Sequence, residues 1–221
     1  MKDQKIKVIL ASGSPRRREI LEGLGIEIQV LVPDADESCA LADPGQYVRE
    51  LSERKWQAAR ALVESRGDTL HNTLMIASDT VVACEGVILG KPRDRADAAE
   101  MLRLLSGREH SVFSGVAVSY GDKMVSDFDE TRVSFSEISP EALEWYLDNC
   151  TYLDKAGAYA IQGIASAWIN KIDGDYFVFR RKRKHFAPPD RDAKKSPTQK
   201  SGGFLLVDQV MISKGTRCLL T

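Results

Sequence analysis

The alternation of short apolar runs with amphipathic segments is the feature that most constrains the fold of this chain. Runs typical of buried strands are found at residues 6–11, 26–32, 74–77 and 165–172. Segments with apolar side chains at helical spacing, or with helix-opening proline, are found at residues 15–24, 44–66, 94–105 and 140–149. This alternation predicts an α/β or α+β fold.

The order of the strands indicates a mixed sheet rather than a purely parallel one. Residues 112–119 and 124–135 read as two strands that pair around the turn Gly121-Asp122. The run at 74–77 is expected to end at residues 78–80 and to resume at 81–82. We therefore expect Asp79 at the end of a strand, where α/β sheets tend to bind ligands.

Composition excludes several classes of protein. The 221 residues are 43% hydrophobic and 29% charged, which rules out collagen-like, coiled-coil and wholly disordered chains. No apolar run approaches the roughly 20 residues that a membrane helix needs. The four cysteines lack the spacing of a zinc site or a disulfide framework. These features predict a soluble protein of a reducing compartment, the cytoplasm.

Charge divides the chain into two parts. Residues 180–200 contain nine Lys and Arg against two Asp, whereas residues 1–179 have a net charge of −9. We predict a folded domain over residues 1–179 and a basic tail of disorder-like composition over 180–221. Nonspecific nucleic-acid binding by this tail is disfavoured, since the body is acidic and Phe186 is the tail's one aromatic residue within the basic run.

A candidate anion site lies at the junction between the first strand and the first helix. Ser12-Gly13-Ser14-Pro15-Arg16-Arg17 combines two hydroxyl groups, a glycine and two guanidinium groups at a helix N-terminus. Unpaired backbone N–H groups and arginines at such a position suit a phosphate. The alternative is a capped helix, with Ser14 as N-cap and arginines on the surface.

Two carboxylates are candidates for proton transfer or metal binding. Asp79 follows an apolar run, and Glu37 lies in an acidic loop after a predicted strand. Carboxylates at such places can hold Mg²⁺ or accept a proton from water. The alternatives are a turn cap for Asp79 and a solvated loop for Glu37.

Three further polar side chains are weaker candidates. Lys55 lies within the helix 44–66 and reads by periodicity as solvated, and Lys91 precedes a proline in extended backbone. Gln162 carries a donor and an acceptor that can read the edge of a pyrimidine, or can satisfy its own loop. For His110 we expect a turn or strand-edge role, since no metal or triad pattern surrounds it.

Together these residues resemble the Maf family of nucleoside triphosphate pyrophosphatases, once described as septum-formation inhibitors. The resemblance spans residues 6–177, and its motifs occur in the family's order: residues 10–17, 78–80, 90–92, 105–110 and 154–163. It implies a fold similar to inosine triphosphate pyrophosphatase, with a long twisted mixed sheet, flanking helices and two lobes around a cleft.

The resemblance also implies a reaction and a set of site residues. It implies hydrolysis of a nucleoside triphosphate to the monophosphate and pyrophosphate with a divalent metal, Mg²⁺ or alternatively Mn²⁺. Asp79 matches the general base and, with Glu37, the metal-binding acids. The phosphate-side positions are Ser12, Ser14, Arg16, Arg17, Lys55 and Lys91. Arg16, Thr80 and Gln162 match the positions that distinguish the branch acting on dTTP and UTP.

One segment departs from the family pattern. After Gly174-Asp175-Tyr176 the family continues with Asn-Val-Val-Gly-Leu-Pro, whereas this chain turns basic. Our hypothesis is a frameshift or an unusual terminus. A non-catalytic nucleotide-binding regulator of cell division with the same fold is the alternative function. The family resemblance also implies a homodimer.

Overall fold

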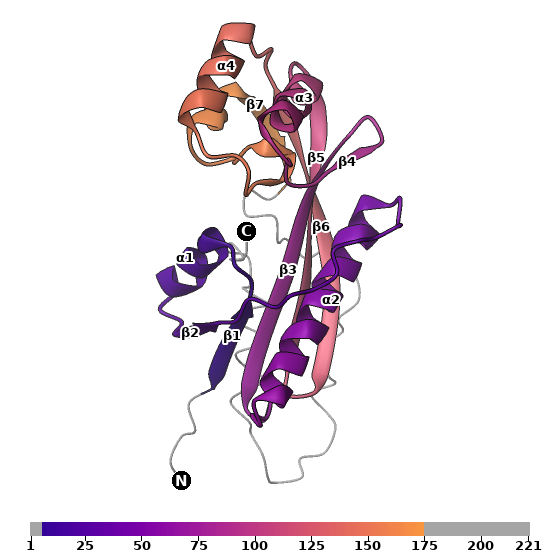
Figure 1. The fold of residues 1–221 in the computed structure, drawn as a ribbon, viewed down its shortest axis with the longest axis vertical. Coiled ribbons are helices and arrows are strands. Elements are labelled where there is room, and N and C mark those ends of the chain that lie inside the picture. The colour runs from indigo at the N-terminus through magenta and orange to yellow at the C-terminus, as the bar shows by residue number, and fades with distance from the viewer. Residues whose placement is uncertain (1–5, 175–221) are drawn as a thin grey trace, which may run out of the picture.

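A computed structural model describes residues 6–174, and within them one mixed sheet of seven strands spans the length of the molecule (Figure 1). The strands are β1 (Lys7–Ala11), β2 (Ile28–Val30), β3 (Thr73–Cys84), β4 (Val87–Leu89), β5 (Glu109–Tyr120), β6 (Lys123–Phe135) and β7 (Ile169–Asp173). The helices are α1 (Pro15–Gly23), α2 (Pro44–Ser65), α3 (Arg95–Leu105) and α4 (Pro140–Asn149), with short 3₁₀ turns at Ala156–Ala158 and Ile164–Trp168. The predicted tail at 180–221 lies outside the described residues.

The sheet is mixed, as the sequence predicts. Its strand order is β2-β1-β3-β5-β6-β7, and β4 pairs with β3 beside this path. The pairs β1–β2 and β1–β3 are parallel, whereas β3, β5, β6 and β7 form antiparallel pairs. The long strands β3, β5 and β6 therefore act as the common frame of the molecule.

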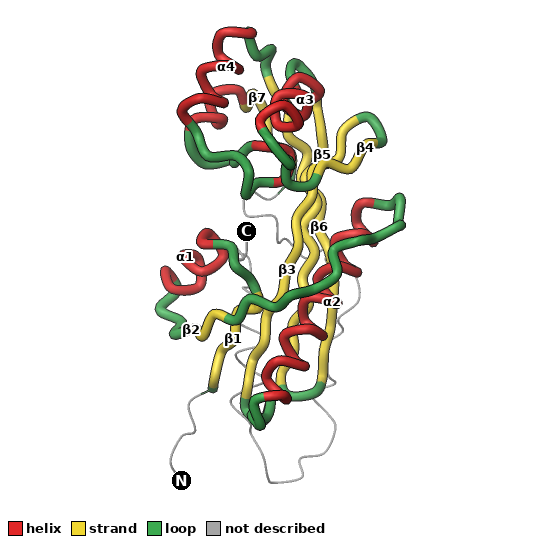
Figure 2. Tube along the Cα trace, in the orientation of Figure 1, coloured by secondary structure: helices red, strands yellow, loops and turns green. Residues whose placement is uncertain are grey.

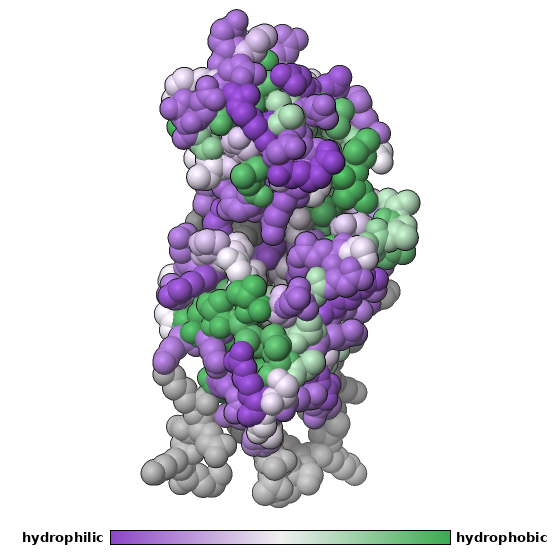
Figure 3. Space-filling model, viewed as in Figure 1, coloured by the Kyte–Doolittle hydropathy of each residue, from purple (hydrophilic) through white to green (hydrophobic). Residues whose placement is uncertain are grey.

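The helices divide the molecule into two parts along this frame (Figures 1 and 2). In the lower part of the view, α1 and α2 lie on opposite faces of the sheet. The upper part contains α3, α4, β4 and β7. The surface is hollowed between the two parts (Figure 3). This confirms the expected long mixed sheet with flanking helices in two lobes. No helix in residues 6–174 is long and apolar enough to cross a membrane.

Local sequence sets the ends of the helices. The carboxylates of Asp43 and Asp94 accept hydrogen bonds from the N–H groups of Gln46 and Asp97, and so cap α2 and α3. After α1, Gly25 has a φ of +74° and its N–H donates to Glu22 O at 2.8 Å, which closes the helix. The expectation for Ser14 is wrong in part, because it occupies the N-cap position but its side chain makes no capping hydrogen bond.

Three strand predictions need correction. β3 does not stop at residues 78–80, because β5 pairs with it continuously from Leu74 to Ala83. Asp79 therefore lies inside a strand and not at its end. β2 is shorter than residues 26–32. The segment 165–172 begins as a 3₁₀ turn and becomes a strand at Ile169.

The pleat of β3 distributes its side chains between the two lower helices. Met75 and Ala77 pack in the same apolar cluster as Trp56 of α2. Leu74 and Ile76 pack in the cluster on the α1 side. Since side chains alternate along a strand, Asp79 faces α2, whereas Ser78 and Thr80 face α1.

Small residues let α2 lie close to the sheet beside Asp79. Gly115 of β5 is the register partner of Asp79. A Cβ atom on Gly115 would lie 2.2 Å from the carbonyl oxygen of Val48, and one on Gly45 would lie 2.2 Å from the Phe128 ring. The absence of side chains at both positions therefore brings the N-terminal half of α2 within reach of Asp79.

His110 is a core residue, so its expected role at a turn or strand edge is wrong. It is 3% exposed in β5, and its Nε2 lies 2.7 Å from the Tyr159 hydroxyl. Its ring also contacts Phe135 edge-on. Within the described residues its Nδ1 is buried with no hydrogen-bond partner. Burial lowers the pKa of His110 to about 4.

This pKa predicts a loss of stability in mild acid. The unfolded chain binds a proton at His110 near pH 6.5, whereas the folded chain binds it only near pH 4. The free energy of unfolding should therefore fall as the pH drops from 6.5 to 4, by about 3 kcal/mol from this group. Urea titrations of wild type and His110→Gln across this range measure it. An equally steep fall in the variant would contradict the assignment.

Candidate active site

The site begins where the pairing of β1 with β3 ends. The parallel ladder stops at Ala11 opposite Ala77. The chain then turns away through Ser12 and Gly13 into α1, and among residues 6–174 no strand pairs with β3 at residues 78–80 on this side. Groups from both faces of the sheet can meet at this edge.

Arg17 occupies the open edge. Its Nη1 donates to the carbonyl oxygen of Ser78 at 2.9 Å and to Ser12 Oγ at 3.0 Å. Its Nη2 donates to Thr80 Oγ1 at 3.0 Å. Burial of the guanidinium lowers the pKa of Arg17, and the charge of Asp79 acts against this effect. Arg17 thus replaces the missing ladder partner and places a fixed positive charge near Asp79.

Asp79, Lys55 and Glu37 form a charged cluster on the α2 side of the edge. Lys55 Nζ lies 2.5 Å from Asp79 Oδ1 and 2.9 Å from Glu37 Oε1. Burial alone would lower the pKa of Lys55, but the two carboxylates outweigh it and raise this pKa. The hydrogen bond from Lys55 in turn lowers the pKa of Glu37. The interpretation of Lys55 as a solvated helix residue is therefore wrong.

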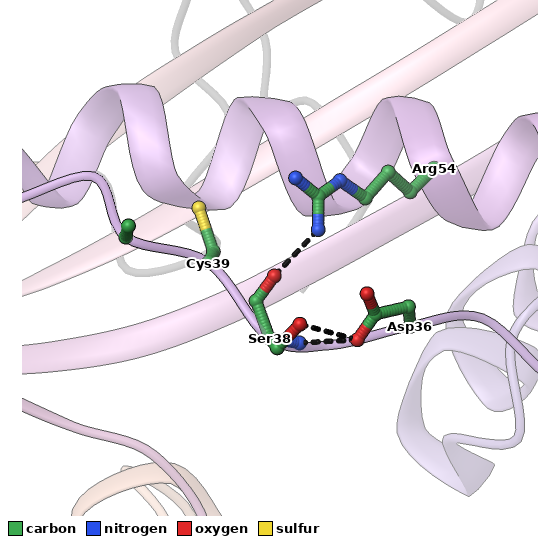
Figure 4. Close-up of a pocket in the computed structure, with 5 residues that line it drawn as sticks. Asp36, Ser38, Cys39 and Arg54 are labelled. Atoms are coloured by element: carbon green, nitrogen blue, oxygen red, sulfur yellow. Dashed lines mark hydrogen bonds between the residues drawn. The ribbon is translucent and has the colours of Figure 1, made fainter.

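The loop that carries Glu37 is also bound to α2 by a hydrogen bond from Arg54 to Ser38 (Figure 4). Arg54 Nη1 donates to the carbonyl oxygen of Ser38 at 2.5 Å, and its Nε donates to Glu50 Oε1 at 2.8 Å. Asp36 Oδ1 accepts hydrogen bonds from both the N–H and the hydroxyl of Ser38. Arg54 and Lys55 are consecutive residues of α2, and they bind two consecutive residues of the loop, Ser38 and Glu37.

Three other predicted site residues, Arg16, Lys91 and Gln162, lie outside the cluster of Asp79, Lys55 and Glu37. The charge of Arg16 acts on Asp154 and Tyr146 of the upper part. Lys91 is exposed, and its charge helps to lower the pKa of Glu37. Gln162 is exposed on the loop before Ile164–Trp168. The structure thus brings together Ser12, Arg17, Thr80, Asp79, Lys55 and Glu37, and does not bring Gln162 into contact with them.

Tyr47 is a site residue that the sequence analysis did not identify. Burial raises the pKa of Tyr47, and the charges of Asp79 and Glu37 add to this effect. It therefore lies beside the carboxylate cluster as a neutral hydroxyl group. The spacing could have revealed Tyr47, because it lies eight residues before Lys55, and side chains at this spacing lie on the same side of a helix. Ser114 was also missed; its Oγ lies 3.0 Å from Thr80 Oγ1.

Comparison with known proteins identifies the family. The family model described as Maf-like protein matches residues 7–179. The chain belongs to the Maf family. It is 43% identical to the dTTP/UTP pyrophosphatase of Symbiobacterium thermophilum over 172 residues, which are 77% of this chain and 85% of that protein. It is 41% identical to the dTTP/UTP pyrophosphatase of Bacillus anthracis, over 77% of this chain and 86% of the relative.

Two solved structures are more distantly similar. The HAM1 protein from Coxiella burnetii is 16% identical with a TM-score of 0.39, over 59% of this chain and 73% of that one. The Ham1 protein of Staphylococcus aureus is 12% identical with a TM-score of 0.42, over 73% and 92%. The family assignment rests on the family model and the closer relatives, and not on these two structures.

The hydrogen bond from Arg54 to the Ser38 carbonyl oxygen predicts that removal of the Arg54 side chain loosens the loop that carries Glu37. In Arg54→Ala the carbonyl of Ser38 loses its donor, so amide hydrogen exchange over residues 36–40 should become severalfold faster. Arg60→Ala is the control, because Arg60 lies on the same helix and also pairs with a glutamate four residues away, Glu64, but its other hydrogen bond goes to Asp122 rather than to the Glu37 loop. Equal exchange over this loop in both variants would show that Arg54 does not hold it.

Proposed function

We propose that this chain hydrolyses dTTP and UTP, with their modified pyrimidine forms, to the monophosphate and pyrophosphate. The names of its relatives support this substrate class. The observation that carries the proposal is the convergence of Asp79, Lys55, Glu37 and Arg17 at the open edge of β3. No feature of the described residues favours the alternative of a non-catalytic regulator.

The N-terminus of α1 is the phosphate-binding region in this proposal. The Ser14 side chain is not used in capping, and the first N–H groups of the helix have no intrahelical partner. Arg16 adds a guanidinium group, and Arg17 is already fixed by Ser12, Ser78 and Thr80. An anion at this position gains hydrogen bonds and the favourable end of the helix dipole.

Glu37 and Asp79 suit a divalent metal ion. Their oxygens Oε1 and Oδ1 already converge on one positive charge, the Lys55 ammonium. Carboxylate oxygens are ligands that Mg²⁺ and Mn²⁺ prefer. When bound, such an ion would polarise the phosphoryl oxygens. Within residues 6–174 no group of three His, Cys, Asp or Glu side chains is placed to hold a metal, so substrate phosphates and water would complete the coordination.

Asp79 is the general base in this proposal. Its Oδ1 accepts the hydrogen bond from Lys55, and its Oδ2 makes no hydrogen bond within the described residues. The Asp79 side chain is 12% exposed, so it is not fully closed off from solvent. Oδ2 would take a proton from a water molecule that attacks the α-phosphorus. The bond from that phosphorus to the bridging oxygen then breaks, and pyrophosphate leaves.

Recognition of the base is assigned to Arg16, Thr80 and Gln162. The exposed amide of Gln162 offers a donor and an acceptor to the carbonyl, N–H, carbonyl edge of uracil or thymine. Thr80 acts through Arg17 and Ser114, since its hydroxyl is bonded to both. It is therefore a positioning residue in this account.

The proposal also covers the extent of the enzyme domain, its cellular compartment and its oligomeric state. We propose that the enzyme domain ends near residue 179, where the family match also ends. The reaction takes place in the cytoplasm, which the free thiols of Cys39, Cys84 and Cys150 support. The homodimer stays a prediction from the family resemblance.

Pyrophosphate release with Mg²⁺ across dTTP, UTP, CTP, GTP, ATP and 7-methyl-GTP tests the function. We expect release mainly from dTTP and UTP. Asp79→Asn should lower turnover by about 10²- to 10⁴-fold, because it removes the proton acceptor. Asp122→Asn is the matched control, since the Asp122 side chain is 82% exposed. Near-normal turnover in Asp79→Asn would overturn the base assignment, and no release from any nucleotide by folded wild type would overturn the function.

A further inference from the structure

The ammonium group of Lys55 lies where two carboxylates converge. It is 2.5 Å from Asp79 Oδ1 and 2.9 Å from Glu37 Oε1. The Lys55 and Asp79 side chains are 15% and 12% exposed, whereas that of Glu37 is 57% exposed. The largely buried ammonium group of Lys55 thus pairs with two carboxylates from different elements, Asp79 of β3 and Glu37 of the loop before α2.

We propose that Lys55 is a placeholder for the metal ion: in the nucleotide-free protein its ammonium occupies the position between Glu37 and Asp79 that a divalent cation takes when the substrate binds. This rests on the proposed function, and it adds an order of events to it. Lys55 would leave the two carboxylates for the phosphates when the nucleotide binds, and Glu37 and Asp79 would then be free to hold the metal ion.

Electrostatic repulsion between the two carboxylates supports this role. Two carboxylates that face one position repel each other unless a cation lies between them. The Lys55 ammonium lies 2.5 Å from Asp79 Oδ1 and 2.9 Å from Glu37 Oε1, so it offsets this repulsion. In this proposal Lys55 keeps the two carboxylate oxygens directed at one point.

The number of protein ligands also supports this role. Glu37 and Asp79 are two carboxylates, and within residues 6–174 no third His, Cys, Asp or Glu side chain completes a group with them. Mg²⁺ bound by one or two carboxylates usually takes further oxygens from substrate phosphates. A metal alone must compete with Lys55 for two ligands, whereas a metal–triphosphate complex brings its own oxygens and gives Lys55 new partners.

The chemistry of the lysine ammonium group also supports this role. A lysine ammonium is a compact charge on a flexible four-carbon stem, so it can leave one anion for another. Arg17 differs, because three hydrogen bonds fix its guanidinium to Ser12, Ser78 and Thr80. The two cations of the site thus have different roles, one fixed and one displaceable.

Binding of Mn²⁺ to the nucleotide-free protein tests the placeholder without use of activity. Free Mn²⁺ is measured by electron paramagnetic resonance at pH 8 for wild type, Lys55→Met and Lys7→Met. We expect Lys55→Met to bind Mn²⁺ about tenfold more tightly than wild type, the scale on which groups around a metal site alter its affinity. Adding Glu37→Gln to Lys55→Met should abolish the gain.

Lys7→Met is the matched control for the change in net charge. Lys7 also pairs with a carboxylate, that of Asp68 at 3.8 Å, but at the opposite end of β1 from the site. It should bind Mn²⁺ as wild type does. Lys55→Gln removes the same charge. It is used in place of Lys55→Met if that variant shows no cooperative thermal unfolding transition.

Each outcome separates the placeholder from the proposed function. Equal or weaker Mn²⁺ binding in the folded Lys55 variants overturns the placeholder, as does an equal gain in Lys7→Met. Wild-type release of pyrophosphate is measured in parallel, and its absence from every nucleotide overturns the proposed function instead. Tighter Mn²⁺ binding confined to the Lys55 variants supports displacement of Lys55 by the metal.

Discussion

The parallel hydrogen bonding between β1 and β3 ends at Ala11 and Ala77, and the candidate site lies at residues 78–80 of β3, where no other strand of residues 6–174 pairs with it on this side. A β-strand edge exposes carbonyl and N–H groups that need partners. Here a side chain, Arg17, supplies one of the missing donors to Ser78. The same hydrogen bond that satisfies this carbonyl oxygen holds a cation near Asp79, so one contact serves both the strand edge and the candidate site.

The alternation of side chains along β3 explains why the site draws on both faces of the sheet. Thr80 faces α1 and meets Arg17, while Asp79 faces α2 and meets Lys55. The second contact also depends on Gly115, because its missing side chain allows α2 to lie against β5 opposite Asp79. One strand thus links the N-terminus of α1, the proposed phosphate-binding region, to the carboxylate cluster.

Local features of the fold were predictable from the sequence, whereas contacts across the sheet were not. Caps such as Asp43 and Asp94 are short-range patterns, and α2, α3 and the β5–β6 pair follow from them and from periodicity. The extent of β3 depends on its partner β5, which no local pattern reveals. The family resemblance placed Lys55 in the site although its helix periodicity indicated a solvated residue.

The central claim is that phosphates and metal meet at the open edge of β3. A crystal structure with Mg²⁺ and a dTTP analogue that has a non-hydrolysable bridge between the α- and β-phosphates tests it most directly. We expect the phosphates at the N-terminus of α1, the metal on Glu37 and Asp79, and Lys55 turned toward the phosphates. A triphosphate bound elsewhere, or a metal held without these two carboxylates, would contradict it.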